Sequence, residues 1–228
     1  MVFERAIKAI LFDLDGTLVK FPSIWEFFDD LLVQALIEFR VHVPPKATRT
    51  VIWHSGSEFE TVLREWGVEN YPAFIEYFDE LDYKLRKKLI ENGTIQLFED
   101  VDVLGALQER FKLGILTNTP PEIAWLEIKA FQLERFFDDF VMLGTVEQNI
   151  AKPEPEGFLR CLNNLEAQPQ EAVMVGDSSS DIIGGNQVGM ITVLVDRPNQ
   201  NTPINLQPPP DLIITDLNGL LQFRSVRD

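Results

Sequence analysis

The chain has 228 residues, 45% of them hydrophobic and 25% charged, with a formal net charge of -16 and a pI near 4.5. This length and composition suit a folded protein with one core and an insertion, or with two small domains. The acidity argues against nucleic acid or an anionic membrane as a partner bound through a broad basic face, and no apolar run reaches the roughly 18 residues of a membrane span.

An apolar run over Ala9–Phe12 leads into two carboxylates, Asp13 and Asp15, followed by Gly16. A short unbroken apolar run that ends at a turn residue predicts a strand buried on both faces. On a strand, Asp13 and Asp15 would point to the same face, where two buried acids repel each other unless a cation compensates them. Mg²⁺ suits such oxygen ligands. A strand end with an acidic turn is the alternative, which D-x-D-G alone does not exclude.

The apolar pattern of residues 19–92 predicts an all-helical block, because apolar residues recur at helical spacing and no strand pattern is present. Two capping boxes and an Asn-x-Pro sequence mark the helix starts, and Asn92 with Gly93 closes the last helix. The aromatic stripes of this block are expected to form core rather than a cofactor site. The expected helices run from Ser23-x-x-Glu26 to Phe39, from Ser57-x-x-Glu60 to Trp66, and from Asn70 to Asn92.

From residue 96 onward, apolar runs alternate with helical patterns, which is typical of a parallel, doubly wound α/β sheet of Rossmann-like form. The helical block follows the first strand, so we expect a discontinuous core, 1–18 and 96–228, and an inserted all-α cap, 19–95. Further strands are expected at 113–116, 140–143, 172–175 and 191–195, with a late edge strand at 212–214 and a last helix at 217–223.

The single cysteine, Cys161, excludes an internal disulfide framework and fits a reducing compartment. It lies in a helix pattern with Phe158 and Leu162, so a buried structural thiol is expected rather than a nucleophile. The first residues contain Glu4 and an early strand and do not resemble a secretory signal. We therefore expect a cytoplasmic protein.

Polar residues stand at, or just after, the ends of four predicted strands, where ligands bind in sheets of this kind. Each signal alone has another explanation, such as a helix cap for the threonine, a solvated surface lysine, or a helix-start acid. Together, acids for a cation and a hydroxyl and a lysine for an anion form one site for a phosphate held against Mg²⁺. The four groups are Asp13 with Asp15, Thr117 with Asn118, Lys152, and Asp177 with Asp181.

Four motifs carry a resemblance that spans the whole chain: F-D-L-D-G-T-L at 12–18, L-T-N at 116–118, A-K-P-E-P at 151–155 and G-D-S-S-S-D at 176–181. In this order and spacing they resemble the haloacid dehalogenase superfamily of phosphohydrolases, in the subgroup with a helical cap after the first strand. That subgroup includes the phosphoglycolate phosphatases. The resemblance implies a haloacid-dehalogenase-type core that uses Mg²⁺ and hydrolyses a small soluble phosphorylated metabolite.

The resemblance implies chemical roles for the two acids of the first motif. Asp13 would be the nucleophile that forms an aspartyl phosphate, and Asp15 would be the general acid for the leaving alcohol and then the base for water. Asp15 argues against dehalogenation, because dehalogenases of this group carry an aromatic residue there. The chain departs from the family after G-T-L-V, where Asp-Ser is common and Lys20-Phe21 stand instead. This departure puts the cap hinge in question.

Binding roles are implied for the later motifs. Thr117 and Lys152 would hold the phosphoryl oxygens, Lys152 would also screen Asp13, and Asn118 would touch the substrate. The implied Mg²⁺ ligands are Asp13, the backbone carbonyl of Asp15, Asp177, and Asp181 directly or through water. In the cap, none of Arg40, His42, Arg49, Trp53, His54 and Arg64 is assigned to the substrate.

Three other functions remain as alternatives. A phosphosugar mutase of the same family would return the phosphate to an isomer instead of releasing it. A non-catalytic phosphate-binding or interaction module is disfavoured because Asp13 and Asp15 are both present. A receiver-type signalling domain would need a phosphorylatable Asp on the third strand and no large helical insertion. Either a monomer or a homodimer is compatible with the sequence.

Overall fold

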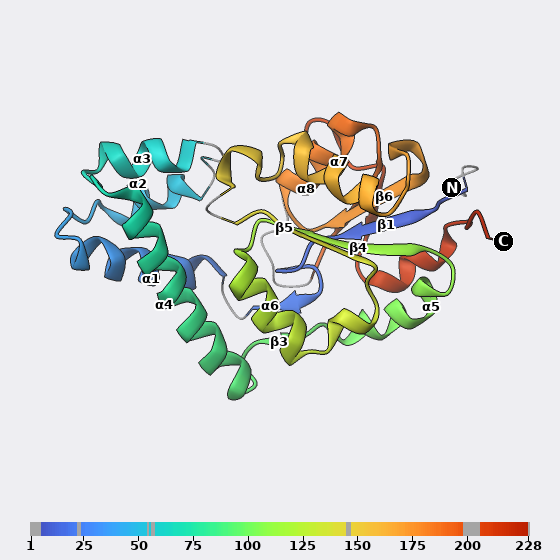
Figure 1. Ribbon diagram of the computed structural model, residues 1–228, viewed down its shortest axis with the longest axis horizontal. Helices are drawn as coiled ribbons and strands as arrows, with labels where there is room; N and C mark the ends of the chain where they lie inside the picture. Colours follow the sequence, from blue (N-terminus) through green and yellow to red (C-terminus); the bar gives the residue numbers. More distant parts are fainter. Residues whose placement is uncertain are drawn as a thin grey trace.

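The computed structural model describes residues 6–21, 24–53, 55, 58–144, 147–197 and 206–227. Helices α1 to α4 lie to one side of an α/β sheet unit (Figure 1). Four residues named above, Glu4, Ser23, His54 and Ser57, lie outside the described residues, so two of the predicted helix caps are not among them.

The sheet unit contains a six-stranded sheet with the order β5-β4-β1-β6-β7-β8, in which every neighbouring pair is parallel. Helices cover both faces, so the predicted doubly wound α/β class is confirmed (Figure 1). The strands are β1 Ala9–Phe12, β4 Lys112–Thr117, β5 Asp139–Met142, β6 Ala172–Gly176, β7 Ile191–Val195 and β8 Leu212–Ile214. The edge strand β8 is also where the sequence predicted it.

β1 is fully buried because its side chains alternate between two hydrophobic cores, as the unbroken apolar run predicts. Ile10 and Phe12 enter the core under α5 (Leu104–Gln108) and α6 (Pro121–Ala130). Ala9 and Leu11 enter the core under α7 (Pro155–Asn164), which α8 (Ser179–Val188) adjoins. Cys161 lies in this second core with no exposed surface, and burial raises the pKa of its thiol well above the usual range. The predicted burial of this thiol is therefore confirmed.

The helical unit consists of α1 Ile24–Glu38, α2 Lys46–Ile52, α3 Phe59–Glu65 and α4 Tyr71–Glu91. It has a core of its own, in which Leu36, Leu63 and Phe74 are fully buried. The side chain of Asn70 caps α4 by accepting a hydrogen bond from the Ala73 N–H at 3.3 Å. α2 was not predicted, because K-A-T-R-T-V-I shows no clear apolar face.

A short ribbon, β2 (Val19–Lys20) paired antiparallel with β3 (Gln96–Leu97), stands where the chain passes between the two units. The prediction that nothing after residue 18 forms a strand before the sheet resumes is therefore wrong at residues 19–20, because two-residue strands carry no periodicity. Phe21 and Ile95 pack into the core of the sheet unit although they lie inside the predicted cap. The boundaries 19 and 95 remain a prediction.

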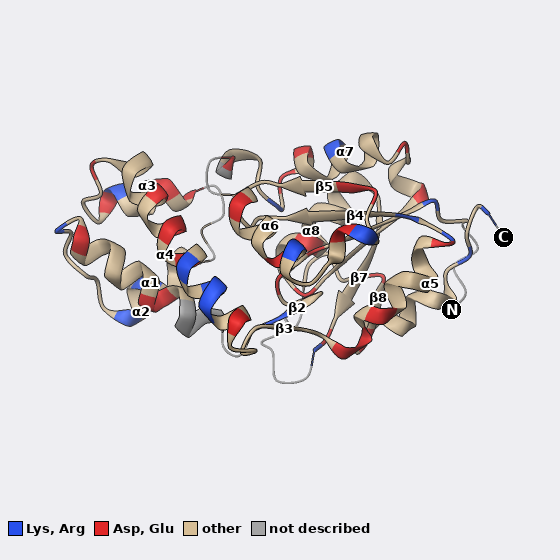
Figure 2. Ribbon diagram, turned by 60° about the horizontal axis from the view of Figure 1, so that its bottom comes forward, with Lys and Arg blue, Asp and Glu red and all other residues tan. Residues whose placement is uncertain are grey.

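The last helix, predicted at 217–223, is a 3₁₀ helix over Leu217–Gln222. A 3₁₀ helix is wound more tightly than an α-helix and is common in short segments of this kind. Gly219 of this helix lies so close to Ile214 that an added Cβ would stand 2.8 Å from that side chain. Acidic residues are spread over both units instead of gathering in one segment (Figure 2). Among the described residues, no helix is long and apolar enough to span a membrane.

Candidate active site

The topology of the sheet brings the predicted polar residues to one edge. β1 lies between β4 and β6, and the chain builds the sheet outward on one side of β1 before it crosses to the other. In such sheets a crevice opens at the carboxyl ends of the strands where the direction of winding changes. Asp13, Thr117 and Asp177 stand at or just after the ends of these three neighbouring strands.

The first ionic cluster, which we call the Lys152 cluster, consists of Lys152, Asp13, Asp177 and Asp181. The Lys152 Nζ donates to Asp13 Oδ1 at 2.7 Å and to Asp181 Oδ1 at 2.6 Å. Lys152 and Asp181 are 4% and 0% exposed, and Asp13 is 7% exposed, so the amine is enclosed while the nucleophile candidate stays within reach of a ligand. The other oxygen of Asp181 accepts hydrogen bonds from the backbone and hydroxyl of Ser178.

The Lys152 cluster holds more negative than positive charge. Burial raises the pKa of Asp13 from its ordinary 3.8 to about 7, and the carboxylates of Asp181 and Asp15 add to the rise while Lys152 opposes it. Burial, Asp13 and Asp181 raise the pKa of Asp177 well above its usual range. Burial lowers the pKa of Lys152, but Asp13 and Asp181 raise it more, so the amine stays charged.

These residues fit a divalent cation. One carboxylate oxygen from each of Asp13, Asp177 and Asp181 can be chosen so that all three lie within 4.8 Å of one another. Oxygen donors of this kind suit Mg²⁺. One lysine facing two buried carboxylates and the half-buried Asp177 leaves a charge imbalance that such a cation would offset.

Two glycines let the strand ends approach each other. Gly16 has φ +79°, and a Cβ at this position would overlap the carboxylate of Asp177. A Cβ on Gly176 would overlap the carboxylate of Asp181 in the same way. Both glycines are therefore needed for packing at the site, and Gly16 is needed for the turn as well.

Asn118 and Thr117 hold other residues of the site. Asn118 exchanges two hydrogen bonds with the backbone of Lys152, at 2.8 and 3.0 Å, and so fixes the loop that carries the lysine. Thr117 donates from its hydroxyl to Thr119 at 3.1 Å, and Thr119 donates to Asp15 Oδ2 at 2.9 Å. The predicted contacts of Thr117 and Asn118 with phosphate or substrate remain a prediction.

The second ionic cluster, which we call the Arg86 cluster, consists of Arg86, Asp15, Asp82 and Glu127. Arg86 and Asp82 come from α4 of the helical unit, and Glu127 comes from α6 of the sheet unit. The Arg86 Nη1 donates to both oxygens of Asp15 at 2.9 Å and to Glu127 Oε1 at 2.6 Å, while Nε donates to Asp82 at 2.7 Å. Arg86 is 1% exposed and Glu127 is fully buried.

Electrostatics in the Arg86 cluster keep the guanidinium charged. Burial lowers the pKa of Arg86, but Asp15, Glu127 and Asp82 raise it more, to well above its usual range. Burial and the nearby Asp15 raise the pKa of Glu127 well above its usual range. Burial also raises the pKa of Asp82, against the lowering effect of Arg86.

Sequence reasoning missed Arg86, Glu127 and Thr119. A signal was present for the first two, because each occupies a core position of an amphipathic helix. Arg86 continues the line of Phe74, Phe78 and Asp82 at spacings of four, and Glu127 precedes the buried Ile128. Charged residues at such positions are rarely buried unless they are paired.

Phe21, at the position where the chain departs from the family pattern, also contacts the Arg86 cluster. The Phe21 ring is 6% exposed and lies 4.6 Å from the Arg86 guanidinium carbon, in cation–π contact. Phe28 of α1 contacts the same guanidinium at 5.4 Å. The hinge residue thus packs against the arginine that reaches Asp15.

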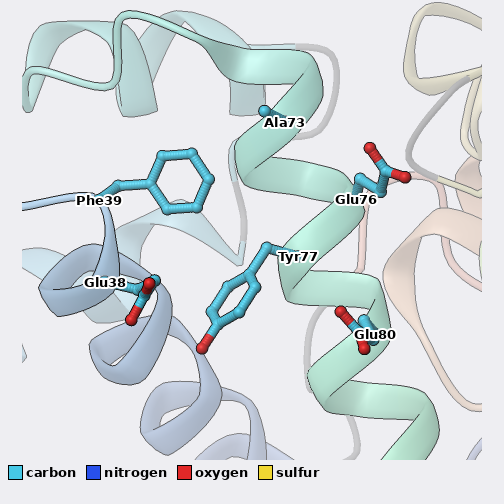
Figure 3. A pocket seen from close by; sticks show the side chains of 6 residues that line it. All are labelled: Glu38, Phe39, Ala73, Glu76, Tyr77 and Glu80. Carbon is cyan, nitrogen blue, oxygen red and sulfur yellow. The ribbon is translucent and has the colours of Figure 1, made fainter.

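A separate hollow of about 320 Å³ lies in the helical unit, between the end of α1 and α4. Figure 3 shows that it is formed by cap side chains alone, and no residue of either ionic cluster lines it. Its acidic lining would repel a phosphate. The lining residues are Glu38, Phe39, Ala73, Glu76, Tyr77 and Glu80.

Of the cap residues left unassigned, several have internal partners. Arg49 forms a two-pronged contact with Asp29 at 2.7 Å, and Arg64 pairs with Glu60 on the surface of α3. Trp53 packs against aromatic neighbours of the same unit. These contacts agree with structural roles.

Comparison with known proteins decides the family. Residues 7–189 match the family of haloacid dehalogenase-like hydrolases. The chain belongs to this family. The resemblance inferred from the four motifs is thereby confirmed, and the chain is an enzyme of the hydrolase class.

Relatives of this hydrolase cover nearly its full length. The pyrophosphatase PpaX of Halalkalibacterium halodurans is 30% identical over 223 residues, which are 97% of this chain and 98% of the relative. The crystal structure of a HAD phosphatase from Thermococcus onnurineus has a TM-score of 0.63 at 26% identity, over 96% of this chain and all of the other (100%). A predicted phosphoglycolate phosphatase from Haemophilus somnus shares the fold, with a TM-score of 0.70 at 23% identity over 95% and 97% of the two chains.

Proposed function

We propose that this hydrolase is a Mg²⁺-dependent phosphomonoesterase that acts on a small soluble metabolite through a phosphate bound covalently to Asp13. The observation that carries the proposal is the environment of Asp13. Its Oδ1 accepts from Lys152, whereas no described residue donates to Oδ2, so one oxygen of a partly reachable carboxylate is available to attack phosphorus.

In the first step, Asp13 Oδ2 forms a bond to phosphorus as the bond from phosphorus to the leaving alcohol oxygen breaks. The departing oxygen takes a proton from Asp15, which Thr119 and Arg86 hold beside the strand end. Lys152 stays charged and attracts the phosphoryl oxygens, and its charge also favours the reactive carboxylate form of Asp13.

In the second step, water gives a proton to the Asp15 carboxylate and its oxygen bonds to phosphorus. The bond between phosphorus and Asp13 then breaks, which releases phosphate and restores both acids. Asp15 therefore serves as acid and then as base, and no further reactant is required.

Mg²⁺ would be held by Asp13, Asp177 and the backbone carbonyl of Asp15, with Asp181 directly or through water. When bound, it would neutralise charge on the phosphoryl oxygens and among the buried acids. The acidic composition and raised pKa values of the site support this assignment.

Inorganic pyrophosphate is the second candidate substrate, favoured by the name of the PpaX relative. Among the described residues, the two buried cations at the site, Lys152 and Arg86, already pair with carboxylates. A pyrophosphate would thus depend on Mg²⁺ to offset the charge of its leaving phosphate. A phosphomonoester carries less charge and fits the described site better.

A panel of phosphomonoesters and pyrophosphate, assayed for free phosphate with Mg²⁺ and with EDTA, tests the proposal. We expect release only with Mg²⁺, abolished by Asp13→Asn and kept by Asp196→Asn, a control aspartate exposed after β7. Release in EDTA, or from Asp13→Asn, would contradict the proposal. An isomer without free phosphate would indicate the mutase instead, and turnover of pyrophosphate alone would favour the second candidate.

A further inference from the structure

Asp15 is held from two sides that belong to different units. Thr119 donates to its Oδ2 from the sheet unit at 2.9 Å. Arg86 donates to both of its oxygens from the helical unit at 2.9 Å. A carboxylate with donors on both oxygens has little rotational freedom about its side-chain torsion.

We propose that Arg86 is a positioning residue that orients Asp15 for proton transfer and makes this orientation depend on the docking of the helical unit. This inference rests on the proposed function, in which Asp15 moves the proton. It assigns no contact between Arg86 and the substrate. Proton transfer in the reaction then becomes sensitive to a residue of the cap.

The surroundings of Arg86 suit this role. α4 packs against α6, and Glu127 of α6 accepts from the same nitrogen of Arg86 that reaches Asp15. Phe21 contacts the guanidinium from the segment that links the two units. The guanidinium is therefore held by residues of both units where the units meet. Its position then depends on how the two units are docked.

Burial alone does not account for the contact with Asp15. Asp82, one turn earlier on α4, already pairs with Arg86, and Glu127 supplies a second partner. The guanidinium nevertheless reaches both oxygens of Asp15, the acid that transfers the proton in the proposed mechanism. Misplacing such a group by about 1 Å costs about 10²-fold in rate.

Arg86→Lys separates positioning from simple stabilisation, because lysine keeps the charge but cannot reach all three acids from fixed positions. We expect the first step with an alkyl phosphate, whose leaving group needs a proton, to slow by about 10²-fold. The burst of nitrophenolate from nitrophenyl phosphate should stay within a factor of about three, because nitrophenolate leaves without a proton. Equal losses on both substrates, or no loss on either, would overturn the proposal.

Arg49→Lys is the matched control, because Arg49 also forms a two-pronged contact with an aspartate but stays inside the helical unit. It should leave both substrates unaffected. Combining Arg86→Lys with Asp15→Asn gives a second test. If Arg86 acts through Asp15, the effect of Arg86→Lys should vanish in the Asp15→Asn background, whereas additive effects would contradict the proposal.

Hydrogen exchange supplies a readout that does not need activity. Arg86→Lys should speed amide exchange in residues 13–20 relative to both wild type and Arg49→Lys, and unchanged exchange would overturn the proposal. This exchange measurement tests whether Arg86 fixes the Asp15 segment even if the wild-type protein hydrolyses no phosphate. Such a lack of hydrolysis would refute the proposed function but not the positioning by Arg86. If Arg86→Lys does not fold, Arg86→Leu combined with Asp82→Leu and Glu127→Leu removes the buried acids of both helices together with their cation and allows the same measurements.

Discussion

Asp13 and Asp15 stand two residues apart at the end of β1, yet they belong to different ionic clusters. Asp13 meets Lys152 within the sheet unit, at strand ends that the topology fixes. Asp15 meets Arg86, which comes from the helical unit across a hinge ribbon. One acid is thus placed by the fold of a single unit, and the other by how two units are docked. The difference suggests that attack and proton transfer respond to different perturbations.

Asp15→Asn should produce the largest effect and separate the two acids most clearly. It removes the base for the second step, a loss of about 10²–10⁴-fold in overall rate. With nitrophenyl phosphate the first step should survive in part, so phosphate should accumulate on Asp13. Acid quenching, intact mass and peptide mapping measure this. A burst of nitrophenolate without any phosphoprotein would mean direct attack by water.

Arg86→Met should destabilise the protein by about 3–5 kcal/mol, because it leaves buried carboxylates without their cation. Denaturant unfolding measures the change in the free energy of unfolding. Arg64→Met is the control, and its exposed pair with Glu60 should cost about 1 kcal/mol or less. Equal losses for the two variants would remove the contrast between a docking cluster and an ordinary ion pair.

Lys152→Met should lower kcat/KM by about 10²–10³-fold, because a fixed charge at the phosphoryl oxygens is lost. Unlike Arg86→Met, this variant should regain much of its stability in Mg²⁺, since a cation from solution can bind beside Asp13. Activity and thermal unfolding with and without Mg²⁺ test both points. Lys112→Met, at an exposed pair with Asp138, is the control. Turnover close to wild type would place the anion-binding role elsewhere.

The pH dependence of stability should be the smallest effect and should single out the Lys152 cluster. The pKa of Asp13 is raised from 3.8 to about 7, so the folded protein without metal binds a proton that the unfolded chain releases. Its contribution to stability is full below about pH 4 and is lost as pH rises toward about 7. In EDTA the unfolding temperature of the wild-type protein should fall as pH rises from about 4 to about 7, and that of Asp13→Asn should fall less.

Mg²⁺ should reverse this trend, because it binds the ionised acids and stabilises only the folded chain. The rise in unfolding temperature on adding Mg²⁺ should therefore be larger at pH 7.5 than at pH 5. A gain that does not depend on pH would contradict the assignment of Asp13 as a ligand.

The fold was largely predictable because its central strands are unbroken apolar runs. β1, β6 and β7 are buried on both faces, so burial is visible in each strand by itself. The β2–β3 ribbon was missed because its partners are two residues long and far apart in sequence. The last helix was predicted at the right place, but the apolar pattern did not show its 3₁₀ form or its close packing against Ile214.

The candidate site was predictable to the extent that strand ends define it. Residues that follow β1, β4 and β6 were found because parallel strands share one carboxyl edge. Arg86 and Glu127 were not, because their meeting depends on how α4 and α6 pack across the units. Periodicity marks them as buried charges but does not say which acid they face.

The central position of β1 has a consequence for how the chain folds during synthesis. β1 is made before its partners, so one of its edges stays unpaired until β4 (Lys112–Thr117) has emerged and the other until β6 (Ala172–Gly176) has emerged. The helical unit needs only local contacts and can form earlier. The acids of the Lys152 cluster therefore come together only after Asp181 leaves the ribosome, and metal cannot assist the early steps of folding.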